Sequence, residues 1–299
     1  MEIIAIGKAL GEKKIDLADV YPDIDRLLDK TGIPCVFETD GDMLDLAEQA
    51  ASQVLPLARD VKLLILVTQS PVDYLPANAV SLASRLNLPK NLLAFDFNQG
   101  CSGFVQSFCL AANLIEKYSQ ILIVTADTYR QKLQKNDRST NAVFSDGSAA
   151  VLLSAENSQV IHYEDHMTAG QHRDFLFQSA TDTENSGYLH MSGGDVWLFT
   201  LREVVPQIAK AIAFCEENGL LIKNIYIHQA SKLVVEGIRK KLEHYQDLFR
   251  VNYSENGNTV SSTIPFLLRD FPLDTQGGVS IFAGFGVGLT SSIVVFGAK

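Results

Sequence analysis

The chain consists largely of short apolar runs that alternate with longer segments in which apolar residues recur at helical spacing. Each short run predicts a buried strand, and such runs lie at 1–7, 61–68, 92–97, 120–127 and 224–228. Residues 42–55 predict an amphipathic helix with Asp42 or Asp40 as its cap, and residues 76–86 a short helix begun by Pro76. Apolar strands alternating with helices are typical of a parallel sheet covered on both faces, so the pattern predicts an α/β fold.

The most apolar helical segment follows the strand at 92–97 and opens with Cys101. No charged side chain occurs between Phe97 and Ile115, and a helix that is apolar on all sides is buried. The unpaired N–H groups and the dipole of a helix start favour a thiolate, which makes Cys101 a candidate nucleophile. A buried structural cysteine would fit the same position equally well.

The second half of the chain repeats the element order of the first, in pattern rather than in identity. Its elements are a helix at 195–217 kinked at Pro206, the strand at 224–228, a helix at 258–268, and strands at 278–284 and 288–297. In the first half, the strand at 120–127 corresponds to the strand at 278–284. Part of a strand pair predicted at 142–154 corresponds to the strand at 288–297. The repeat predicts two similar halves, residues 1–155 and 156–299, that meet along a pseudo-twofold axis, with a surface insertion near 164–187.

The composition narrows the class of protein. Hydrophobic residues make up 46% of the chain and charged residues 20%, which is typical of a soluble globular protein. The net charge of −10 argues against nucleic acid or an anionic membrane as the general partner. No basic segment precedes a long apolar run at the start, so we expect no signal peptide and a cytoplasmic protein. The cysteines indicate a reducing cytosol and lack the spacing of metal ligands; they are Cys35, Cys101, Cys109 and Cys215.

Three further segments carry candidate chemistry. His228 ends an apolar strand, which is where α/β folds place functional groups, although a lone histidine is more often structural. Asn258 follows a glycine, and a simple turn is the commoner meaning of such an asparagine. The glycines of 284–288 would let a backbone approach another group closely and expose N–H groups as an oxyanion hole, or would simply form a tight hairpin.

Taken together, these segments resemble the ketoacyl-acyl-carrier-protein synthase III branch of the thiolase superfamily. The resemblance extends from Val61 to the C-terminus, whereas residues 1–60 fit the family only loosely. Several spaced motifs in register make it specific. The motifs are Asn98-Gln99-Gly100-Cys101-Ser102-Gly103-Phe104, Asp137-Arg138-Ser139-Thr140, Phe144-Ser145-Asp146-Gly147-Ser148-Ala149-Ala150, His228-Gln229-Ala230, Gly257-Asn258-Thr259 and Gly284-Phe285-Gly286-Val287-Gly288.

The resemblance implies a layered αβαβα arrangement and a condensing enzyme of fatty-acid biosynthesis. Cys101 would take an acyl group from a coenzyme A or acyl-carrier-protein thioester, with no permanently bound cofactor and no metal. A malonyl thioester would then lose carbon dioxide while His228 and Asn258 donate hydrogen bonds to its enolate oxygen. The oxyanion of the acyl group would lie on backbone N–H groups of the nucleophile and the glycine turn, at Cys101, Gly286 and Val287. The family also implies a homodimer.

The chain departs from the family at positions that select the acyl-thioester donor. Arg26 stands where many members carry a tryptophan that packs on adenine, and Lys30 where they carry an arginine. Arg138, the second adenine-stacking position, is retained, and Phe285 is expected among the substrate-binding residues. Leu75 occupies the position that in relatives reaches across a dimer to close the partner's acyl pocket. Acyl carrier protein is therefore an expected partner, and basic residues that could dock it are Lys232, Arg239, Lys240 and Lys241.

Other functions remain open at this point. An acyltransferase that forms an ester or amide in a specialised pathway would keep Cys101 and His228 and need Asn258 less. A thiolase would need a second cysteine near the last glycine turn, and residues 277–288 contain none. A papain-like cysteine protease shares the order Cys, His, Asn, but its nucleophile lies near the mature N-terminus within a different local signature.

Overall fold

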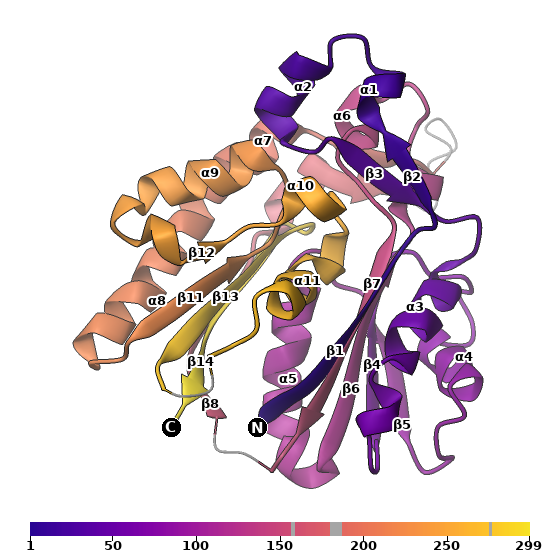
Figure 1. The fold of residues 1–299 in the computed structure, drawn as a ribbon, viewed down its shortest axis with the longest axis vertical. Helices are drawn as coiled ribbons and strands as arrows, with labels where there is room; N and C mark the ends of the chain where they lie inside the picture. Colours follow the sequence, from indigo (N-terminus) through magenta and orange to yellow (C-terminus); the bar gives the residue numbers. More distant parts are fainter. Residues whose placement is uncertain (157–158, 180–186, 275–276) are drawn as a thin grey trace.

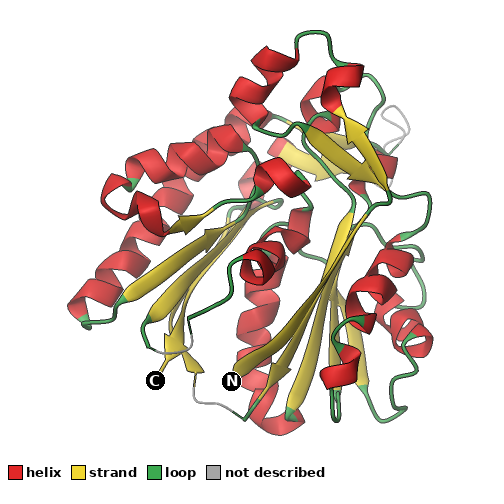
Figure 2. Ribbon diagram, viewed as in Figure 1, coloured by secondary structure: helices red, strands yellow, loops and turns green. Residues whose placement is uncertain are grey.

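The computed structural model describes residues 1–156, 159–179, 187–274 and 277–299. Its framework is a pair of five-stranded mixed sheets with helices packed between and outside them (Figures 1 and 2). The first sheet has the order β1-β7-β6-β4-β5 and the second β12-β11-β13-β14-β8. The strands of the first are β1 (Glu2–Leu10), β4 (Leu63–Val67), β5 (Leu93–Phe97), β6 (Gln120–Asp127) and β7 (Gly147–Ser154). Those of the second are β8 (Gln159–Thr168), β11 (Ile222–Ile227), β12 (Phe249–Arg250), β13 (Val279–Gly286) and β14 (Thr290–Ala298).

The two sheets have the same topology. From β1 across to β5, the pairings are antiparallel, antiparallel, parallel and parallel. From β8 across to β12 they follow the same sequence. The duplication predicted from element order is thus confirmed. The expected parallel sheet is found only in part, because β7 and β14 each return antiparallel beside the central strand of their sheet.

Helices form the remaining three layers. Between the sheets lie α5 (Gly103–Tyr118) and α11 (Thr263–Asp270), as Figure 1 shows. The outer face of the first sheet carries α3 (Met43–Ser52) and α4 (Asn78–Arg85), and that of the second α8 (Val205–Glu217) and α9 (Lys232–Lys241). One buried apolar cluster contains side chains of both sheets together with α5 and α11, so the predicted αβαβα layering is confirmed.

Shorter elements cover the upper end of the molecule in Figure 1, near the carboxyl ends of the parallel strands. They are β2 (Lys13–Asp16), α1 (Leu17–Val20), α2 (Ile24–Thr31), β3 (Cys35–Glu38), α6 (Arg138–Asn141), β9 (Leu176–Gln178), β10 (Leu189–Met191), α7 (Gly193–Phe199) and α10 (Tyr253–Asn256). Short 3-10 helices lie at Leu55–Leu57, Tyr129–Lys132, Gly170–Phe175, Glu243–Leu248 and Val260–Ser262.

Local chemistry explains several helix boundaries. Asp42 caps α3 as predicted, because its side chain accepts from the N–H of Asp45 while the Asp45 side chain accepts from the N–H of Asp42. The helix expected to begin at Pro76 begins instead at Asn78. The helix predicted at 195–217 is α7, a π-helical segment (Thr200–Val204) and α8. Pro206 has no N–H to donate and its ring crowds the preceding turn, which is where the helix widens.

Three other expectations need correction. Residues 142–146 form no strand, so only β7 remains of the predicted strand pair. Asn258 precedes α11 rather than starting it. The insertion predicted near 164–187 begins inside β8, which pairs with β14 at the edge of the second sheet. Such an edge strand has an exposed face, so its sequence is as polar as that of a loop. Part of that insertion, 180–186, lies outside the described residues.

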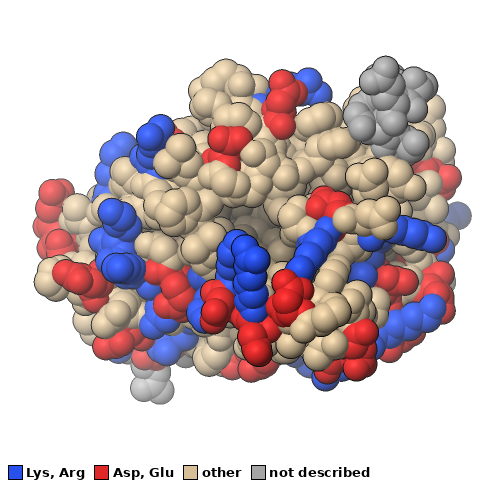
Figure 3. Space-filling model, turned by 90° about the horizontal axis from the view of Figure 1, so that it is seen from above, with Lys and Arg blue, Asp and Glu red and all other residues tan. Residues whose placement is uncertain are grey.

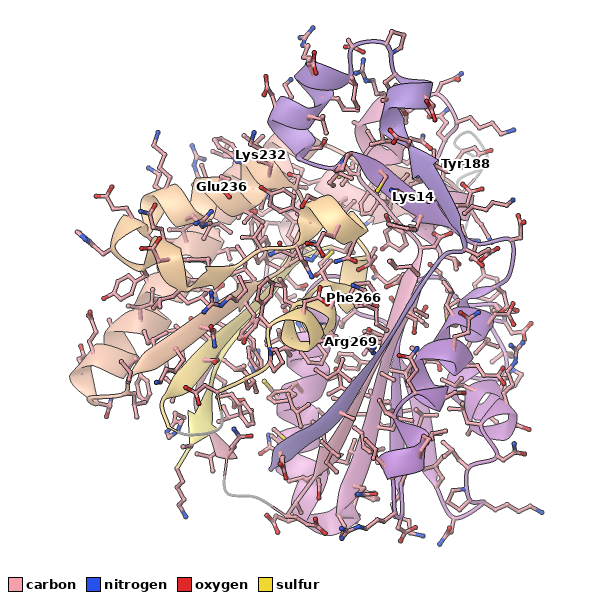
Figure 4. The ribbon with its side chains drawn as sticks, in the orientation of Figure 1. Lys14, Tyr188, Lys232, Glu236, Phe266 and Arg269 are labelled. Carbon is pink, nitrogen blue, oxygen red and sulfur yellow. The ribbon has the colours of Figure 1, made fainter. Side chains whose placement is uncertain are left out.

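The two halves are held together by polar contacts as well as by the buried cluster. The Lys8 ammonium lies 4.5 Å from the centroid of the Phe266 ring. Arg269 donates from Nη1 to the carbonyl of Ile6 and to the Gln53 side chain, both at 2.8 Å. Figure 4 shows Phe266 and Arg269 on α11, beside the first sheet. In the part of the chain that the structure describes, no helix combines the length and the apolar character needed to cross a membrane.

Candidate active site

Cys101 lies in the turn that joins β5 to α5, buried with 5% of its surface exposed. The turn is closed by the N–H of Gly103, which donates to the carbonyl of Gly100 at 2.8 Å. The helix begins at Gly103, directly after Ser102. The predicted position of Cys101 at the start of a buried helix is therefore confirmed.

The turn between β13 and β14 lies against the Cys101 side chain. A Cβ placed on Gly286, whose φ is 153°, would stand 2.9 Å from Cys101 Cβ and 3.0 Å from its Sγ. The backbone N–H of Val287 hydrogen-bonds to the Cys101 sulfur. Thr290 holds this turn by donating from Oγ1 to the carbonyl of Val287 at 2.7 Å. Residues 284–288 therefore form a tight hairpin that also brings an N–H group to the sulfur. The two predictions for these glycines, a hairpin and a site of exposed N–H groups, are compatible.

Burial changes the expected state of the thiol. It raises the pKa of Cys101 to about 12, and the charge of Asp127 adds to this effect. Hydrogen bonds from the backbone N–H groups of Val287 and Cys101 lower the pKa but do not offset burial. The expectation of a thiolate favoured by the helix start is therefore wrong for the free protein, because loss of water outweighs the N–H groups.

His228 follows β11 and is buried, with 2% of its surface exposed. Its Nδ1 lies 2.7 Å from Thr263 Oγ1, at the start of α11. Its ring meets the Phe285 ring edge-on, with the centroids 5.6 Å apart. Burial lowers the pKa of His228 to about 3, so the imidazole is neutral at physiological pH.

Asn258 is held by its backbone and by one end of its carboxamide. Its N–H donates to the carbonyl of Val143 at 2.9 Å, and its carbonyl accepts from the N–H of Ser145 at the same distance. Its Oδ1 accepts from the N–H of Val260 at 2.9 Å. The Nδ2 group is therefore the end of the carboxamide that is turned outward as a donor.

These contacts place the three candidate residues around the end of β13 and the start of α11. His228 and Cys101 both contact the end of β13, the first at Phe285 and the second at Gly286. His228 and Asn258 are connected through the start of α11. The Thr263 hydroxyl oxygen that lies against His228 is also 3.3 Å from the carbonyl oxygen of Val260, and the N–H of Val260 donates to Asn258 Oδ1.

A cavity of about 730 Å³ opens at the upper end of the molecule and reaches Asn258. Figure 3, which looks down on this end, shows a hollow with Lys and Arg side chains beside it. The sequence-predicted residues Arg26, Lys30 and Arg138 all line the cavity, and other lining residues come from α2, α7 and α9. The lining includes neither Cys101 nor His228 and neither Leu75 nor Phe285.

Comparison with known proteins identifies the family. Family models for 3-oxoacyl-[acyl-carrier-protein] synthase III and for its C-terminal part match residues 95–169 and 215–297. The beta-ketoacyl-[acyl-carrier-protein] synthase III 2 of Bacteroides thetaiotaomicron is 30% identical over 82% of this chain and 78% of its own length. The chain belongs to the 3-oxoacyl-[acyl-carrier-protein] synthase III family. It is thus a condensing enzyme, and the comparisons do not support a papain-like protease.

Other members of the synthase III family match over nearly the whole chain. The beta-ketoacyl-[acyl-carrier-protein] synthase III of Clostridium acetobutylicum is 29% identical over 97% of this chain and 96% of its own. A crystal structure of a 3-oxoacyl-(acyl-carrier-protein) synthase III has a TM-score of 0.89 and 31% identity, with 98% of each chain covered. The same enzyme from Pseudomonas aeruginosa PAO1 has a TM-score of 0.89 at 27% identity, covering 99% of this chain and 98% of its own. The fold is accordingly thiolase-like.

This synthase III family member has buried polar residues behind Cys101 that the sequence analysis did not single out. Asp127, the last residue of β6, accepts from the N–H of Gln69 at 2.8 Å and from Ser261 Oγ at 2.5 Å. The Tyr129 hydroxyl donates to Gln69 Oε1 at 2.7 Å. Burial raises the pKa of Asp127 to about 7. Its place at the end of a wholly buried strand was the signal that could have identified it.

The charged residues at the mouth of the cavity differ in how they are held. Asp23, which the sequence analysis missed, pairs with Arg138 through contacts of 2.6 and 2.9 Å. The Arg138 guanidinium also lies 4.9 Å from the Tyr21 ring centroid. Arg26 and Lys30 are exposed on α2. The position of the Arg138 side chain is therefore fixed by neighbours on both sides.

The basic residues of α9 are not equivalent. Arg239 forms an ion pair with Glu236 at 2.8 Å, whereas Lys240 and Lys241 are exposed. Lys232 lies at the start of α9 beside α2, and its Cβ would be 2.7 Å from a Cβ on Gly32. Figure 4 labels Lys232 and Glu236 on this helix. Only part of the predicted basic surface is therefore available to a partner.

Proposed function

We propose that Cys101 is the acyl-carrying nucleophile of this condensing enzyme. The observation that carries the proposal is the Val287 N–H on the Cys101 sulfur, with the backbone of Gly286 pressed against the same side chain. In the first step the sulfur attacks the carbonyl of an acyl thioester, and the tetrahedral oxyanion accepts from the N–H groups of Cys101 and Val287. The donor thiol leaves with the proton lost by Cys101, giving a covalent acyl-enzyme and no net change in charge.

In the second step a malonyl thioester loses carbon dioxide and becomes an enolate. His228 and the Asn258 carboxamide donate hydrogen bonds to its oxygen, and each such donor is worth about 3–4 kcal/mol of transition-state stabilisation. The enolate carbon forms a bond to the acyl carbon, the bond to the Cys101 sulfur breaks, and a 3-oxoacyl thioester results. The released thiolate takes a proton from solvent, which the high thiol pKa of about 12 favours.

The tautomer of His228 matters for this step. A donor to the enolate oxygen needs its proton on Nε2, and Nδ1 must then accept. In this tautomer the Thr263 hydroxyl directs its single proton to Nδ1, 2.7 Å away, instead of to the carbonyl of Val260 at 3.3 Å. The imidazole acts as a neutral donor because burial lowers its pKa to about 3.

Coenzyme A or acyl-carrier-protein thioesters are the proposed substrates, and no bound cofactor is needed. Their phosphate groups would meet Arg26, Lys30 and Arg138 around the cavity, although Arg138 is already paired with Asp23. Acyl carrier protein is the proposed partner because Lys240 and Lys241 lie exposed on the helix that borders the cavity. The acylation rate can be compared across a panel of thioester donors. A rate with acetyl coenzyme A well above the rate with every carrier-protein thioester would contradict the preference for acyl carrier protein.

A homodimer is part of the proposal. Tyr74 and Leu75 each have 88% of their surface exposed on the loop before α4. β5, which follows α4, is an edge strand of the first sheet, and Leu93 on it is 45% exposed. A second copy pairing along β5 would cover these apolar side chains and bring Leu75 to the partner's acyl pocket. A chain that sediments as a monomer at micromolar concentration would exclude this arrangement.

The test of the nucleophile is direct. Incubation with an acyl thioester should add one acyl mass per chain on the peptide that contains Cys101. Cys101→Ala should abolish the label, while Cys215→Ala, at another buried cysteine, should retain it. A label that survives in Cys101→Ala would overturn the assignment.

The acceptor separates the condensation from an ester- or amide-forming acyltransferase. The labelled enzyme should lose its acyl group when malonyl-acyl-carrier protein is added, with release of carbon dioxide. Alcohols and amines should leave the label in place. The reverse pattern would favour the acyltransferase of a specialised pathway.

A further inference from the structure

A second cysteine of α5 lies among potential metal ligands, away from the acyl site. Cys109, Glu164 and His166 each offer one ligand atom, and these atoms all lie within 4.8 Å of one another. Cys109 lies within α5, whereas Cys101 lies just before this helix begins. Glu164 and His166 lie on β8, which packs against α5. The cluster therefore bridges the two halves of the fold.

The register of the second sheet explains why these side chains meet. Glu164 and His166 stand at alternate positions of β8, so their side chains project from the same face of the strand. His166 pairs with Ser292 and Glu164 with Val294 on β14. The helix brings Cys109 to this face, where its surface is only 5% exposed. No local pattern indicates this meeting, because the residues are far apart along the chain.

The imidazole of His166 is already oriented. Its Nδ1 lies 2.7 Å from the hydroxyl of Ser292, which is fully buried. Its Nε2 is 3.7 Å from Glu164 Oε2, which is too long for a hydrogen bond between them. Histidines that bind metals are usually held in this way, with one ring nitrogen fixed by a neighbour and the other free for the ion.

The spacing suits a small tetrahedral ion. Bonds of about 2.0–2.3 Å at tetrahedral angles separate ligand atoms by about 3.3–3.8 Å. The distance between the His166 and Glu164 atoms already lies in this range, and the sulfur needs a shift of about 1 Å at most. One thiolate, one imidazole and one carboxylate form a donor set for Zn²⁺ rather than for Mg²⁺ or Ca²⁺, which prefer oxygen alone.

We propose that Cys109, Glu164 and His166 bind a Zn²⁺ ion, with a water molecule as the fourth ligand. The ion ties the edge strand β8 of the second sheet to α5, the helix that follows the nucleophile. Glu164 and His166 have 49% and 43% of their side chains exposed, so the ion can enter from solvent. The role is structural, because the cluster borders neither the acyl site nor the large cavity.

Binding replaces a proton by the ion. Burial raises the pKa of Cys109 to about 12, and the charge of Glu164 and a hydrogen bond to it add to this effect. The thiol is therefore protonated in the free chain, and Zn²⁺ displaces that proton to solvent as the Zn–S bond forms. The competing description is a plain thiol–carboxylate hydrogen bond, which would hold no metal.

The probe is Co²⁺, which takes the place of Zn²⁺ and reports thiolate ligation by a charge-transfer band in the near ultraviolet. The full chain, stripped with a chelator and titrated with Co²⁺, should bind one ion and develop this band. Cys101→Ala should develop it equally, which separates the cluster from the acyl site. Zn²⁺ should abolish the band by competition and raise the thermal midpoint of the chain.

Variants assign the ligands. Cys109→Ser should lose the band, and Glu164→Gln or His166→Gln should weaken binding by more than about 100-fold. Both of the latter change exposed side chains, so they keep the test valid if the buried variant folds poorly. Ser292→Ala should weaken binding by about 10- to 100-fold, because only the orientation of His166 is lost.

Matched controls lie close by. His162→Gln changes another histidine of β8, whose Nε2 contacts the carbonyl of Ala298, and Cys215→Ser changes another buried cysteine. Both should bind Co²⁺ as the unmodified chain does. The proposal is overturned if no band develops, or if the band persists in Cys109→Ser and disappears in Cys101→Ala. Neither result would bear on the acyl-transfer function.

Discussion

The two halves of the molecule have one topology and different chemistry at equivalent positions. β4 is followed by Thr68 and β11 by His228, although the two strands occupy the same place in their sheets. β6 ends at Asp127 and β13 at Gly286, and both of these residues act on Cys101. One contributes a charge that disfavours the thiolate, and the other has no side chain, so the backbone can reach the sulfur.

The connections after these central strands differ most. Residues 128–146 separate β6 from β7 and include α6, which brings Arg138 to the cavity. Residues 287–289 separate β13 from β14 and leave the Val287 N–H directed at the sulfur. A long connection therefore provides binding surface, whereas the short one provides a rigid donor.

The paired inner helices show the same division. α5 begins just after Cys101, whereas α11 begins at Thr263, beyond Asn258. The proposed nucleophile thus comes from one half, and the proposed donors His228 and Asn258 come from the other. The proposed reaction therefore depends on the packing of the halves, and substitutions at equivalent positions should have unequal effects.

The largest effect is expected at the end of β13. Gly286→Ala places a methyl group 2.9 Å from Cys101 Cβ at a φ of 153°, which an L-residue rarely adopts. We expect a loss of at least about 1000-fold in acylation, because the sulfur and the Val287 N–H are displaced together. Stopped-flow acyl transfer measures it. Gly170→Ala, where the methyl meets open space, is the control and should act like the unmodified chain. Near-normal acylation of Gly286→Ala would refute the oxyanion site.

Asn258→Asp should separate the two steps of the reaction. The carboxylate keeps the acceptor for the Val260 N–H but replaces the outward Nδ2 donor by oxygen. Condensation should fall by about 100- to 1000-fold, while acylation of Cys101 stays within a few-fold of normal. Mass spectrometry of the acyl-enzyme and product analysis distinguish the steps. An equal loss in both would mean that Asn258 serves the nucleophile instead.

A smaller loss of condensation activity is expected from a substitution at Thr263, which contacts His228 rather than the substrate. Thr263→Val removes the hydroxyl 2.7 Å from His228 Nδ1 and leaves the tautomer unfixed. Condensation should fall by about 10-fold, and Thr263→Ser should restore it. The pKa of His228 is about 3, so it stays neutral above about pH 4 and its titration should not shape the profile from pH 5 to 8. A limb near pH 6.5 that disappears in His228→Gln would contradict this account.

Elements whose pattern is local could be predicted from the sequence. The apolar runs of β4, β6 and β11 lie on buried strands, and the cap at Asp42 depends on neighbours in the chain. Repeated element order was sufficient to predict two similar halves. The sequence also placed Cys101 just before a buried helix, as the structure has it, whereas Asn258 was expected to start a helix and instead lies before α11.

Features that depend on the partner segment could not be predicted. β8 has an exposed face and is as polar as a loop, so only its pairing with β14 reveals it. The state of the Cys101 thiol depends on burial by β13 and on Asp127, which no local pattern encodes. The meeting of Cys109 with His166 is likewise set by the packing of α5 on β8.

The smallest effect tests the charge at the end of β6. Asp127 has a pKa of about 7, so its carboxyl is neutral below that pH and charged above it. When charged, it raises the pKa of Cys101, and Asp127→Asn should therefore speed alkylation of Cys101 by iodoacetamide only above about pH 7. We expect about 3- to 10-fold at pH 8.5 and no difference at pH 5.5.

Peptide mass spectrometry measures this alkylation, and Asp247→Asn, at an exposed carboxylate, is the control and should leave the rate unchanged at both pH values. A gain of equal size at both values would mean that the carboxamide introduced in place of Asp127 has altered the shape of the site rather than its charge. The residues that end β6 and β13 would then both act on Cys101 through shape rather than through charge. A gain confined to the higher pH would establish that the first half acts on the nucleophile through charge and the second through backbone geometry.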